Sequence, residues 1–394
     1  MIKFFKNPCN IYISLLAFYS MQGAIIPTGG TLFSQLILLV AMLMGLYYTI
    51  KTITLPNKPV YFNGLNLLFL MFIVYGTILL TSSHHYMVSF SDLDVANYSF
   101  LKNIFLSLPN IYTFFYFSRK EYLTEKKIRY WIIVFFGIAI FRYFDYKLLS
   151  IHLLQLSGSD MEDITNNMGY LFVALIPMIA VYKEIRLQYC LLAACITFIV
   201  IGMKRGAILV GCVSLFYFLY FNYRYNRNIS KWKVILFSLL IIVATYFITE
   251  HLMETSDYFV SRISQTLEGG SSGRNDLYEY FWDHFKNETD IFKFLFGNGA
   301  NATLGIGVNY AHNDWLEIAI NQGVFGLIIY GIYWLNFWRT IKTTKYNKTA
   351  KLVLTLTFLF FFIKTLFSMS YTEYSMETCV VFGYYLVHCG DVES

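Results

Sequence analysis

The sequence has few of the residues that keep a protein soluble. Charged residues make up 14% of its 394 positions, whereas apolar residues make up 57% and the mean hydropathy is +0.52. Proline occurs only 6 times against 38 Phe and 33 Tyr, which excludes disordered and fibrous chains because these lack so much apolar surface. A soluble globular protein is excluded too, and the composition indicates a polytopic membrane protein.

Cysteine and metal motifs are equally scarce. The six cysteines lie in or beside apolar runs, none forms a C-x-x-C pair and none lies in the long polar segment. We therefore expect free thiols, with no disulfide, no zinc or other metal, and no cofactor. The net charge of +6 predicts no nucleic-acid partner, because the basic residues follow a membrane-orientation pattern.

Apolar runs of about 20 residues, the length of helix that crosses a bilayer, divide the chain into spans. They predict an all-α polytopic fold of about 12 transmembrane helices. We expect these helices near residues 10–26, 31–50, 62–82, 99–117, 130–145, 168–182, 188–203, 206–222, 232–249, 314–337, 350–369 and 376–388.

The distribution of lysine and arginine predicts the orientation of these helices, because cytoplasmic loops retain positive charge. If the N-terminus is cytoplasmic, the inner segments hold 20 of the 30 basic residues and five acidic ones, a net +15 that leaves −9 for the rest. Both termini are then cytoplasmic. We expect spans 1–9 in residues 1–249, a periplasmic loop with short amphipathic helices in 250–311, and spans 10–12 with a cytoplasmic tail in 312–394.

The long polar loop contains one helix-like stretch, residues 274–285, after a glycine- and serine-rich turn at 268–273. Its aromatic residues recur at helical spacing, which predicts a small amphipathic helix on the membrane surface. These residues are Tyr278, Phe281, Trp282 and Phe285.

His312 lies at the end of this loop, just before the tenth predicted span. Asp314 and Glu317 form an acidic capping box that predicts the start of the helix. The partial positive charge of that helix end keeps the imidazole neutral, as a general base requires. A polar anchor at the membrane interface is the alternative role for His312.

Further along this span, three glycines predict close packing of a neighbouring helix; they are Gly323, Gly326 and Gly331.

Basic residues on the outer side oppose the orientation rule and need an explanation. Lys204 and Arg205 lie in the short outer turn between spans seven and eight, where apolar surroundings make two cations costly. An anionic group such as a lipid-linked diphosphate would compensate, since an arginine fork matches phosphate oxygens. Snorkelling to lipid headgroups is the alternative. Arg274 is a second candidate, because arginine is unfavourable at a helix start.

The combination of these motifs resembles the O-antigen polymerase and O-antigen ligase superfamily. His312 and Asn313, followed after nine residues by Gly323 and after two more by Gly326, fit the pattern H-[NSQ]-x9-G-x-x-[GTY]. Two further elements are similar to the arginine motifs of the family: Arg205 with Gly206, and Arg274 in the run S-G-R-N-D-L-Y. Tyr278 departs from the leucine that ligases commonly have there. The resemblance covers roughly residues 165–335.

The resemblance implies a membrane glycosyltransferase of the bacterial inner membrane with a periplasmic active site. Its donor and acceptor would be undecaprenyl-diphosphate-linked oligosaccharides, and a chain-length regulator protein is an implied partner. The transfer would be metal-independent and inverting. His312 would be the catalytic base, while Arg205, Arg274 and Lys204 would bind the donor diphosphate. The residues in supporting roles would be Asn313, Glu317, Gly323 and Gly326.

The sequence favours a polysaccharide polymerase over an O-antigen ligase. The loop 250–311 has a net charge of −5, and an acidic surface repels the phosphorylated lipid A core that a ligase would use as acceptor. Two other classes remain open. The D-x-D motif of Asp92 and Asp94 is the feature a metal-dependent glycosyltransferase would use. A flippase would bury charged residues along several spans. The only candidates for such buried charges are Lys102, Arg142 and Lys364.

Overall fold

A computed structural model gives the arrangement of most of the chain. It describes residues 6–25, 32–81, 93–156, 165–225, 230–267, 274–307, 309–345, 347–368, 370–371 and 374–389, without the side chains of 22–25, 93–99, 153–154, 262 and 265–267.

All regular elements among these described residues are helices. The first group of helices is α2 (Pro8–Ile25), α3 (Leu32–Ile53), α4 (Tyr61–Thr81), α5 (Leu93–Arg119), α6 (Glu125–Leu156), α7 (Gly169–Ile179), α8 (Ile185–Ile201), α9 (Arg205–Tyr225) and α10 (Lys231–Thr255). Four shorter helices follow: α11 (Asp257–Leu267), α12 (Arg274–Lys286), α13 (Ile291–Phe296) and α14 (Thr303–Ile306). The chain continues with α15 (Asp314–Thr343), α16 (Lys348–Lys364), α17 (Met376–Leu386) and the 3-10 turn η1 (Val387–Cys389).

Each predicted span coincides with a helix in the described residues: the first nine with α2 to α10, and the last three with α15 to α17. These elements agree with the prediction of an all-α membrane protein. Helices suit a membrane because each helix satisfies its own backbone hydrogen bonds in an apolar environment. Among the described residues, α3, α4, α9, α10 and α15 are long and apolar enough to cross a membrane. The count of twelve spans and their orientation stay predictions.

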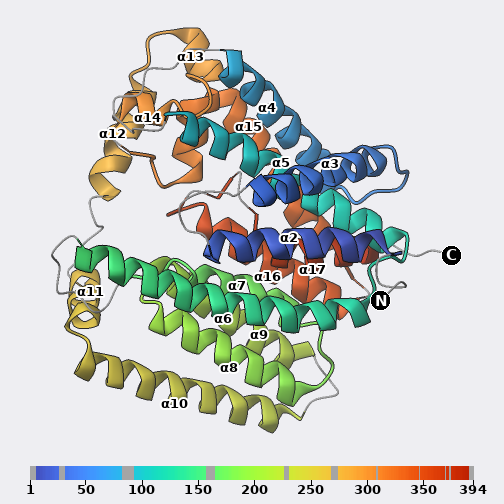
Figure 1. Ribbon diagram of the computed structural model, residues 1–394, viewed down its shortest axis with the longest axis vertical. Helices are drawn as coiled ribbons and strands as arrows, with labels where there is room; N and C mark the ends of the chain where they lie inside the picture. The colour runs from blue at the N-terminus through green and yellow to red at the C-terminus, as the bar shows by residue number, and fades with distance from the viewer. Residues whose placement is uncertain are drawn as a thin grey trace.

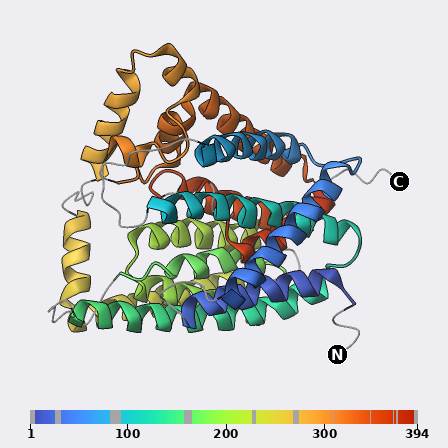
Figure 2. The same ribbon diagram turned by 45° about the horizontal axis from the view of Figure 1, so that its top comes forward.

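The helices form two groups joined by the C-terminal helices. In Figure 1, α6 to α10 lie together in the lower half and α3, α4, α5 and α15 in the upper half. Helix α16 contacts α7 and α9 in the lower group and α15 in the upper group, while α17 contacts both α5 and α7. Figure 2 shows α11 to α14, in yellow and orange, at the edge of the molecule opposite the start of α2.

The upper group packs closely because a glycine allows two helices to approach. A methyl group on Gly64 of α4 would lie 2.7 Å from the Tyr333 Cα atom of α15. Beside this contact, the hydroxyl groups of Tyr61 and Tyr333 are 2.9 Å apart and hydrogen bonded. Both tyrosines are fully buried, so the hydrogen bond satisfies polar groups that water cannot reach.

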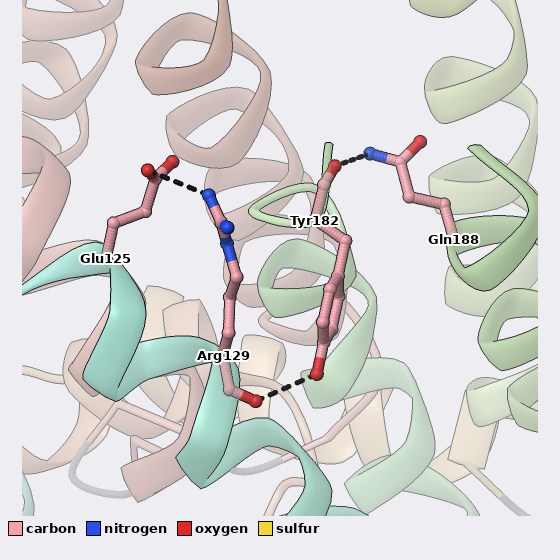
Figure 3. A network of polar contacts seen from close by, with 4 residues as sticks. All are labelled: Glu125, Arg129, Tyr182 and Gln188. Atoms are coloured by element: carbon pink, nitrogen blue, oxygen red, sulfur yellow. Dashed lines mark hydrogen bonds and ion pairs between the residues drawn. The ribbon is translucent and has the colours of Figure 1, made fainter. Parts of the chain in front are cut away.

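A polar cluster joins the start of α6 to the turn between α7 and α8 (Figure 3). Glu125 and Arg129 form an ion pair of 2.9 Å. The Tyr182 hydroxyl donates to the Arg129 carbonyl oxygen at 2.8 Å, and Gln188 donates to the Tyr182 carbonyl oxygen. These bonds fix the start of α6 against the connection that leads into α8.

Candidate functional site

The turn between α8 and α9 carries the first two predicted cations. Lys204 immediately precedes α9, and Arg205 is its first residue, as the sequence predicts. Gly206 is closely packed, because a methyl group there would lie 2.1 Å from the Tyr170 hydroxyl oxygen and 2.6 Å from the Phe367 ring. The start of α9 is therefore packed directly against α7 and the segment that follows α16.

The start of α12 contacts the same segment from the other side. Arg274 is the first residue of α12, as predicted, and its Nη1 atom donates to the Phe367 carbonyl oxygen at 2.8 Å. One turn later, the Tyr278 hydroxyl donates to the His312 carbonyl oxygen at 3.1 Å. Helix α12 thus connects Arg274 to Phe367 and to the backbone of the candidate base.

The predicted capping box at the start of α15 is wrong, because Asn313 is the N-cap. Its Oδ1 atom accepts hydrogen bonds from the backbone N–H groups of Trp315 and Leu316, at 3.0 and 3.2 Å, while its Nδ2 donates to the Leu366 carbonyl oxygen at 3.0 Å. Asparagine is a strong N-cap residue, so Asp314 and Glu317 are free to turn into the protein.

Glu317 is fully buried and holds the segment before His312. Its Oε1 atom accepts from the Ala311 backbone N–H at 2.5 Å. Its Oε2 atom accepts from the Thr303 hydroxyl at 2.8 Å and from Asn321 Nδ2 at 3.2 Å. The carboxylate therefore links α15 to α14 and to the residue immediately before His312.

Asp314 is also fully buried, and it holds the segment after α16. Its carboxylate accepts from the Ser370 backbone N–H at 2.7 Å and from the Ser370 hydroxyl at 2.9 Å, and the Tyr330 hydroxyl donates to it at 3.0 Å. The Asp314 backbone N–H donates to the Thr365 carbonyl oxygen at 2.9 Å. Two buried carboxylates thus fix the chain on both sides of His312.

The environment of His312 lowers the pKa of its imidazole from the usual 6.5. Burial is the largest cause, followed by the positive charges of Arg274 and Lys204, which all disfavour a further cation. The imidazole is consequently neutral at pH 7. The lowered pKa agrees with the predicted neutral state, but its causes are burial and two cations, whereas the sequence indicated the helix end. The charges of Lys204 and Arg274, from two different elements, thus both act on His312.

Gly323 lies against the last turn of the short helix α13, so the predicted close approach of another helix is present at this glycine. It has a φ of 67° and interrupts the helical geometry of α15. A methyl group there would lie 2.6 Å from Gly297 N and from the Leu295 carbonyl group. Next to this kink, the carbonyl oxygens of Ile320 and Asn321 accept from Asn298 N at 2.9 Å and Gly299 N at 3.0 Å. The end of α13 and the loop that follows it therefore pack against the kink.

At the other two glycines of α15, none of the nearest atoms belongs to another helix. A methyl group on Gly326 would lie 2.3 Å from Gln322 Cβ and 3.0 Å from Ile318, both within α15 itself. A methyl group on Gly331 would have no neighbouring atom within 4 Å. Gly326 accommodates the bend that Gly323 begins, whereas Gly331 has no packing role.

The aromatic helix predicted at 274–285 is present as α12, but the protein covers part of its apolar face. Phe281 and Phe285 are buried in a cluster with Ala311, Ala319 and Ile320. The side chain of Trp282 is half exposed. The helix is thus held against α15, and only its other aromatic residues are available to a membrane surface.

We did not predict the segment that follows Lys364 from the sequence. The predicted span continues to residue 369, but α16 ends at Lys364, and the next residues accept hydrogen bonds from α12 and from the start of α15. The Trp315 Nε1 atom also donates to the Thr365 hydroxyl at 3.0 Å. A helix end leaves carbonyl groups unpaired, and here the residues around His312 satisfy several of them. The serines at positions 368 and 370, which interrupt the apolar run, were the available signal.

Some predicted features lie outside the described residues. These are Asp92 and the side chain of Asp94 in the D-x-D motif, and the glycine- and serine-rich turn at 268–273.

Comparison with known proteins identifies a family domain in the region that contains most of this site. Residues 190–331 match a family model described as O-antigen ligase. The match includes the α8–α9 turn, α12 and the start of α15, and it ends before the segment 365–370. No curated protein matches the chain.

Proposed function

Since this chain belongs, through residues 190–331, to the O-antigen polymerase and ligase superfamily, we propose that it is a polysaccharide polymerase. It transfers a growing glycan from undecaprenyl diphosphate to a sugar hydroxyl of another lipid-linked repeat unit. One observation carries this proposal: the half-buried imidazole of His312 is neutral and interacts electrostatically with the charges of Arg274 and Lys204. A base beside a cationic phosphate site suits glycosyl transfer from a diphosphate.

The reaction requires a base on the acceptor and cations on the leaving group. The acceptor oxygen attacks the anomeric carbon from the face opposite the diphosphate, while the bond from that carbon to the phosphate oxygen breaks. The electron pair leaves with undecaprenyl diphosphate, and the hydroxyl proton passes to His312. Attack from the opposite face inverts the anomeric centre, and no metal is needed when fixed cations stabilise the leaving charge.

The residues around His312 support these roles. Arg205, Arg274 and Lys204 hold the donor diphosphate, because guanidinium groups bind phosphate oxygens in a bidentate manner. The lowered pKa of His312 keeps the imidazole able to accept a proton at neutral pH. Asn313 and Glu317 position the imidazole, since they fix the backbone on either side of it. Gly323 and Gly326 form the bend that supports this part of α15.

The charge of the outer loop favours polymerase over ligase. Asp276, Glu279 and Asp283 of α12 are all exposed, so this helix presents carboxylates beside the site. A phosphorylated lipid A core would be repelled by such a surface, whereas a repeat unit that carries its phosphates only on its lipid anchor would be repelled less. O-antigen ligase is the second candidate, because the matching family model carries that description.

We propose that the enzyme works in the bacterial inner membrane with its site facing the periplasm.

Deletion in the native host, followed by gel analysis of the surface glycan, tests the activity. We expect lipid A core that carries a single repeat unit, because a polymerase acts before the ligase. Bare core with accumulating lipid-linked polymer would instead identify a ligase. Unchanged glycan would contradict both activities.

Complementation of that deletion tests the site residues. We expect His312→Ala to reduce polymer formation by about 10² to 10⁴-fold, the usual contribution of a general base, and Arg205→Ala to abolish it. His251→Ala, in the exposed last part of α10, is the matched control and retains full activity. Membrane insertion of each variant is checked by immunoblot. Polymer at the wild-type level from an inserted His312→Ala variant would remove the histidine from the mechanism.

A further inference from the structure

Lys364 is a cation at this site that neither the sequence motif nor the family match includes. It is the last residue of α16, and its side chain is partly buried. Its Nζ atom lies 5.3 Å from the centroid of the Tyr170 ring, the geometry of a cation–π contact. Lysine in a largely apolar helix of a membrane protein is costly, so a functional reason for its charge is expected.

Tyr170 connects Lys364 to the predicted phosphate-binding residues. Its hydroxyl oxygen is so close to Gly206 that a methyl group there would lie 2.1 Å away, and Gly206 directly follows Arg205. Arg274 is also within electrostatic range of Tyr170. Tyr170 therefore contacts the start of α9 through Gly206, and the cations of the start of α12 and the end of α16 act on it.

Neutralisation of Asp314 is the simpler explanation for Lys364, since the two residues are within electrostatic range. The contacts argue against this as its whole role. The Asp314 carboxylate already accepts three hydrogen bonds, two from Ser370 and one from Tyr330. The ammonium group of Lys364 lies over the ring of Tyr170, and the hydroxyl of that tyrosine lies beside Gly206 in the Arg205 turn.

We propose that Lys364 is a further donor-binding residue, whose ammonium group contacts the diphosphate of the lipid-linked donor beside Arg205 and Arg274. The Tyr170 ring orients the lysine, so that a flexible side chain is held where the phosphates bind. This inference rests on the proposed function. This role explains why a lysine ends α16 at the same end of the molecule as His312. The leaving diphosphate gains negative charge as its bond to the anomeric carbon breaks, and a fixed cation stabilises that charge.

Binding of undecaprenyl diphosphate to the purified full-length protein in detergent tests this inference without knowledge of the sugars. Loss of one charge-assisted contact weakens binding about tenfold, so we expect this increase in Kd for Lys364→Met. Lys364→Arg keeps the charge and stays within about threefold of the wild-type Kd. Undecaprenol, which has no phosphate, binds all three proteins equally if Lys364 contacts phosphate and not the prenyl chain.

Lys342 provides a matched control from the other end of the molecule. Its Nζ atom also lies 5.3 Å from an aromatic ring, that of Trp338, in the last turn of α15. At 1.5 Å per residue, this turn is on the order of 40 Å from the start of α15. Lys342→Met therefore removes the same kind of cation–π contact without touching the site, and we expect its Kd for undecaprenyl diphosphate to be unchanged.

The possible results separate this inference from the proposed function. Wild-type affinity in Lys364→Met, combined with weakened binding in Arg274→Gln, would overturn the role of Lys364 and leave the proposed function intact. Recovery of affinity in the double variant Lys364→Met/Asp314→Asn would also overturn it, because the lysine would then serve only to balance Asp314. If the wild-type protein bound undecaprenyl diphosphate no better than undecaprenol, the proposed function itself would fail.

Discussion

His312 has a backbone conformation that its neighbours must hold. Its φ of 53° lies in the left-handed region, which a residue with a side chain adopts at a cost of roughly 1–2 kcal/mol. Three hydrogen bonds maintain it: Ala311 N to Glu317, Tyr278 to the His312 carbonyl oxygen, and Asp314 N to the Thr365 carbonyl oxygen. Strain that several elements together maintain is typical of functional residues, and here it fixes the direction of the imidazole.

The lowered pKa of His312 predicts a pH dependence. A base is active when neutral, and the imidazole is neutral above its pKa, so the acid limb of the activity profile should lie below pH 6.5. Peptide-resolved modification by diethylpyrocarbonate, which reacts with neutral imidazole, measures the titration without relying on activity. We expect the reactivity of His312 to be retained down to a pH below 6.5.

Removal of a neighbouring charge tests the cause of this lowered pKa. Lys204→Met eliminates one of the two cations that disfavour the imidazolium, so it should raise the pKa of His312 towards 6.5 and move the loss of reactivity to higher pH. The exposed His251 serves as a reference for the reagent in both proteins. Equal titration of His312 in the wild type and the variant would show that Lys204 has no influence on the imidazole.

Single residues of the site were predictable where they broke a rule of membrane sequences. Lys204 and Arg205 oppose the positive-inside pattern, Arg274 opposes the helix dipole, and His312 precedes a helix start. The role of Glu317 towards Ala311 was not predictable, because the sequence does not reveal which backbone groups a buried carboxylate will meet. Lys364 lies near the end of an apolar run. Its contact with Tyr170 depends on the packing of α16 against α7, which the sequence does not reveal.

At the scale of single elements, α15 consists of two helical parts joined at Gly323. The first part carries Asp314 and Glu317 and begins beside His312, whereas the second part packs against α4. Glycine in an apolar run gives no sequence signal for a kink, because isolated glycines are common in membrane helices. The helix positions were predictable from apolar runs, but the kink and the loop that packs against it depend on contacts between distant residues.

Alanine substitutions at two glycines of α15 test this division. Gly323→Ala should destabilise the protein by more than about 2 kcal/mol, because its φ of 67° is left-handed and the methyl group would meet Gly297 and Leu295. Gly331→Ala should be neutral or stabilise by up to about 1 kcal/mol, because its methyl group would have no neighbouring atom within 4 Å. Unfolding in detergent, followed by circular dichroism, measures both changes. Equal stability of the two variants would contradict a rigid kink.

At the scale of the whole molecule, the loops contact one another in two sets. At one end, Asn7 donates to the Tyr122 carbonyl oxygen at 3.0 Å, and Arg119 donates to the Asn57 carbonyl oxygen at 3.3 Å. At the other end, Arg274 binds the segment after α16, and the Thr165 hydroxyl hydrogen bonds to that of Tyr258 at 2.7 Å. Each of these contacts joins loops that the charge pattern assigns to the same side of the membrane, so the contacts agree with the predicted grouping of the loops. Which end of the molecule faces the cytoplasm stays a prediction.

Labelling of single cysteines in intact cells tests this sidedness for the whole chain. The six native cysteines are free thiols and are first replaced by alanine. Asn287→Cys, exposed after α12, should react with a membrane-impermeant maleimide added outside the cytoplasmic membrane, because it shares the end of the molecule with Arg274 and His312. Asn57→Cys and Glu121→Cys, which are exposed in turns at the opposite end, should react only after the membrane is permeabilised. Labelling of Asn57→Cys and Asn287→Cys from the same side would mean that the number of crossings between α4 and α12 is even, and the site of His312 would then face the cytoplasm or the helix assignment would be wrong.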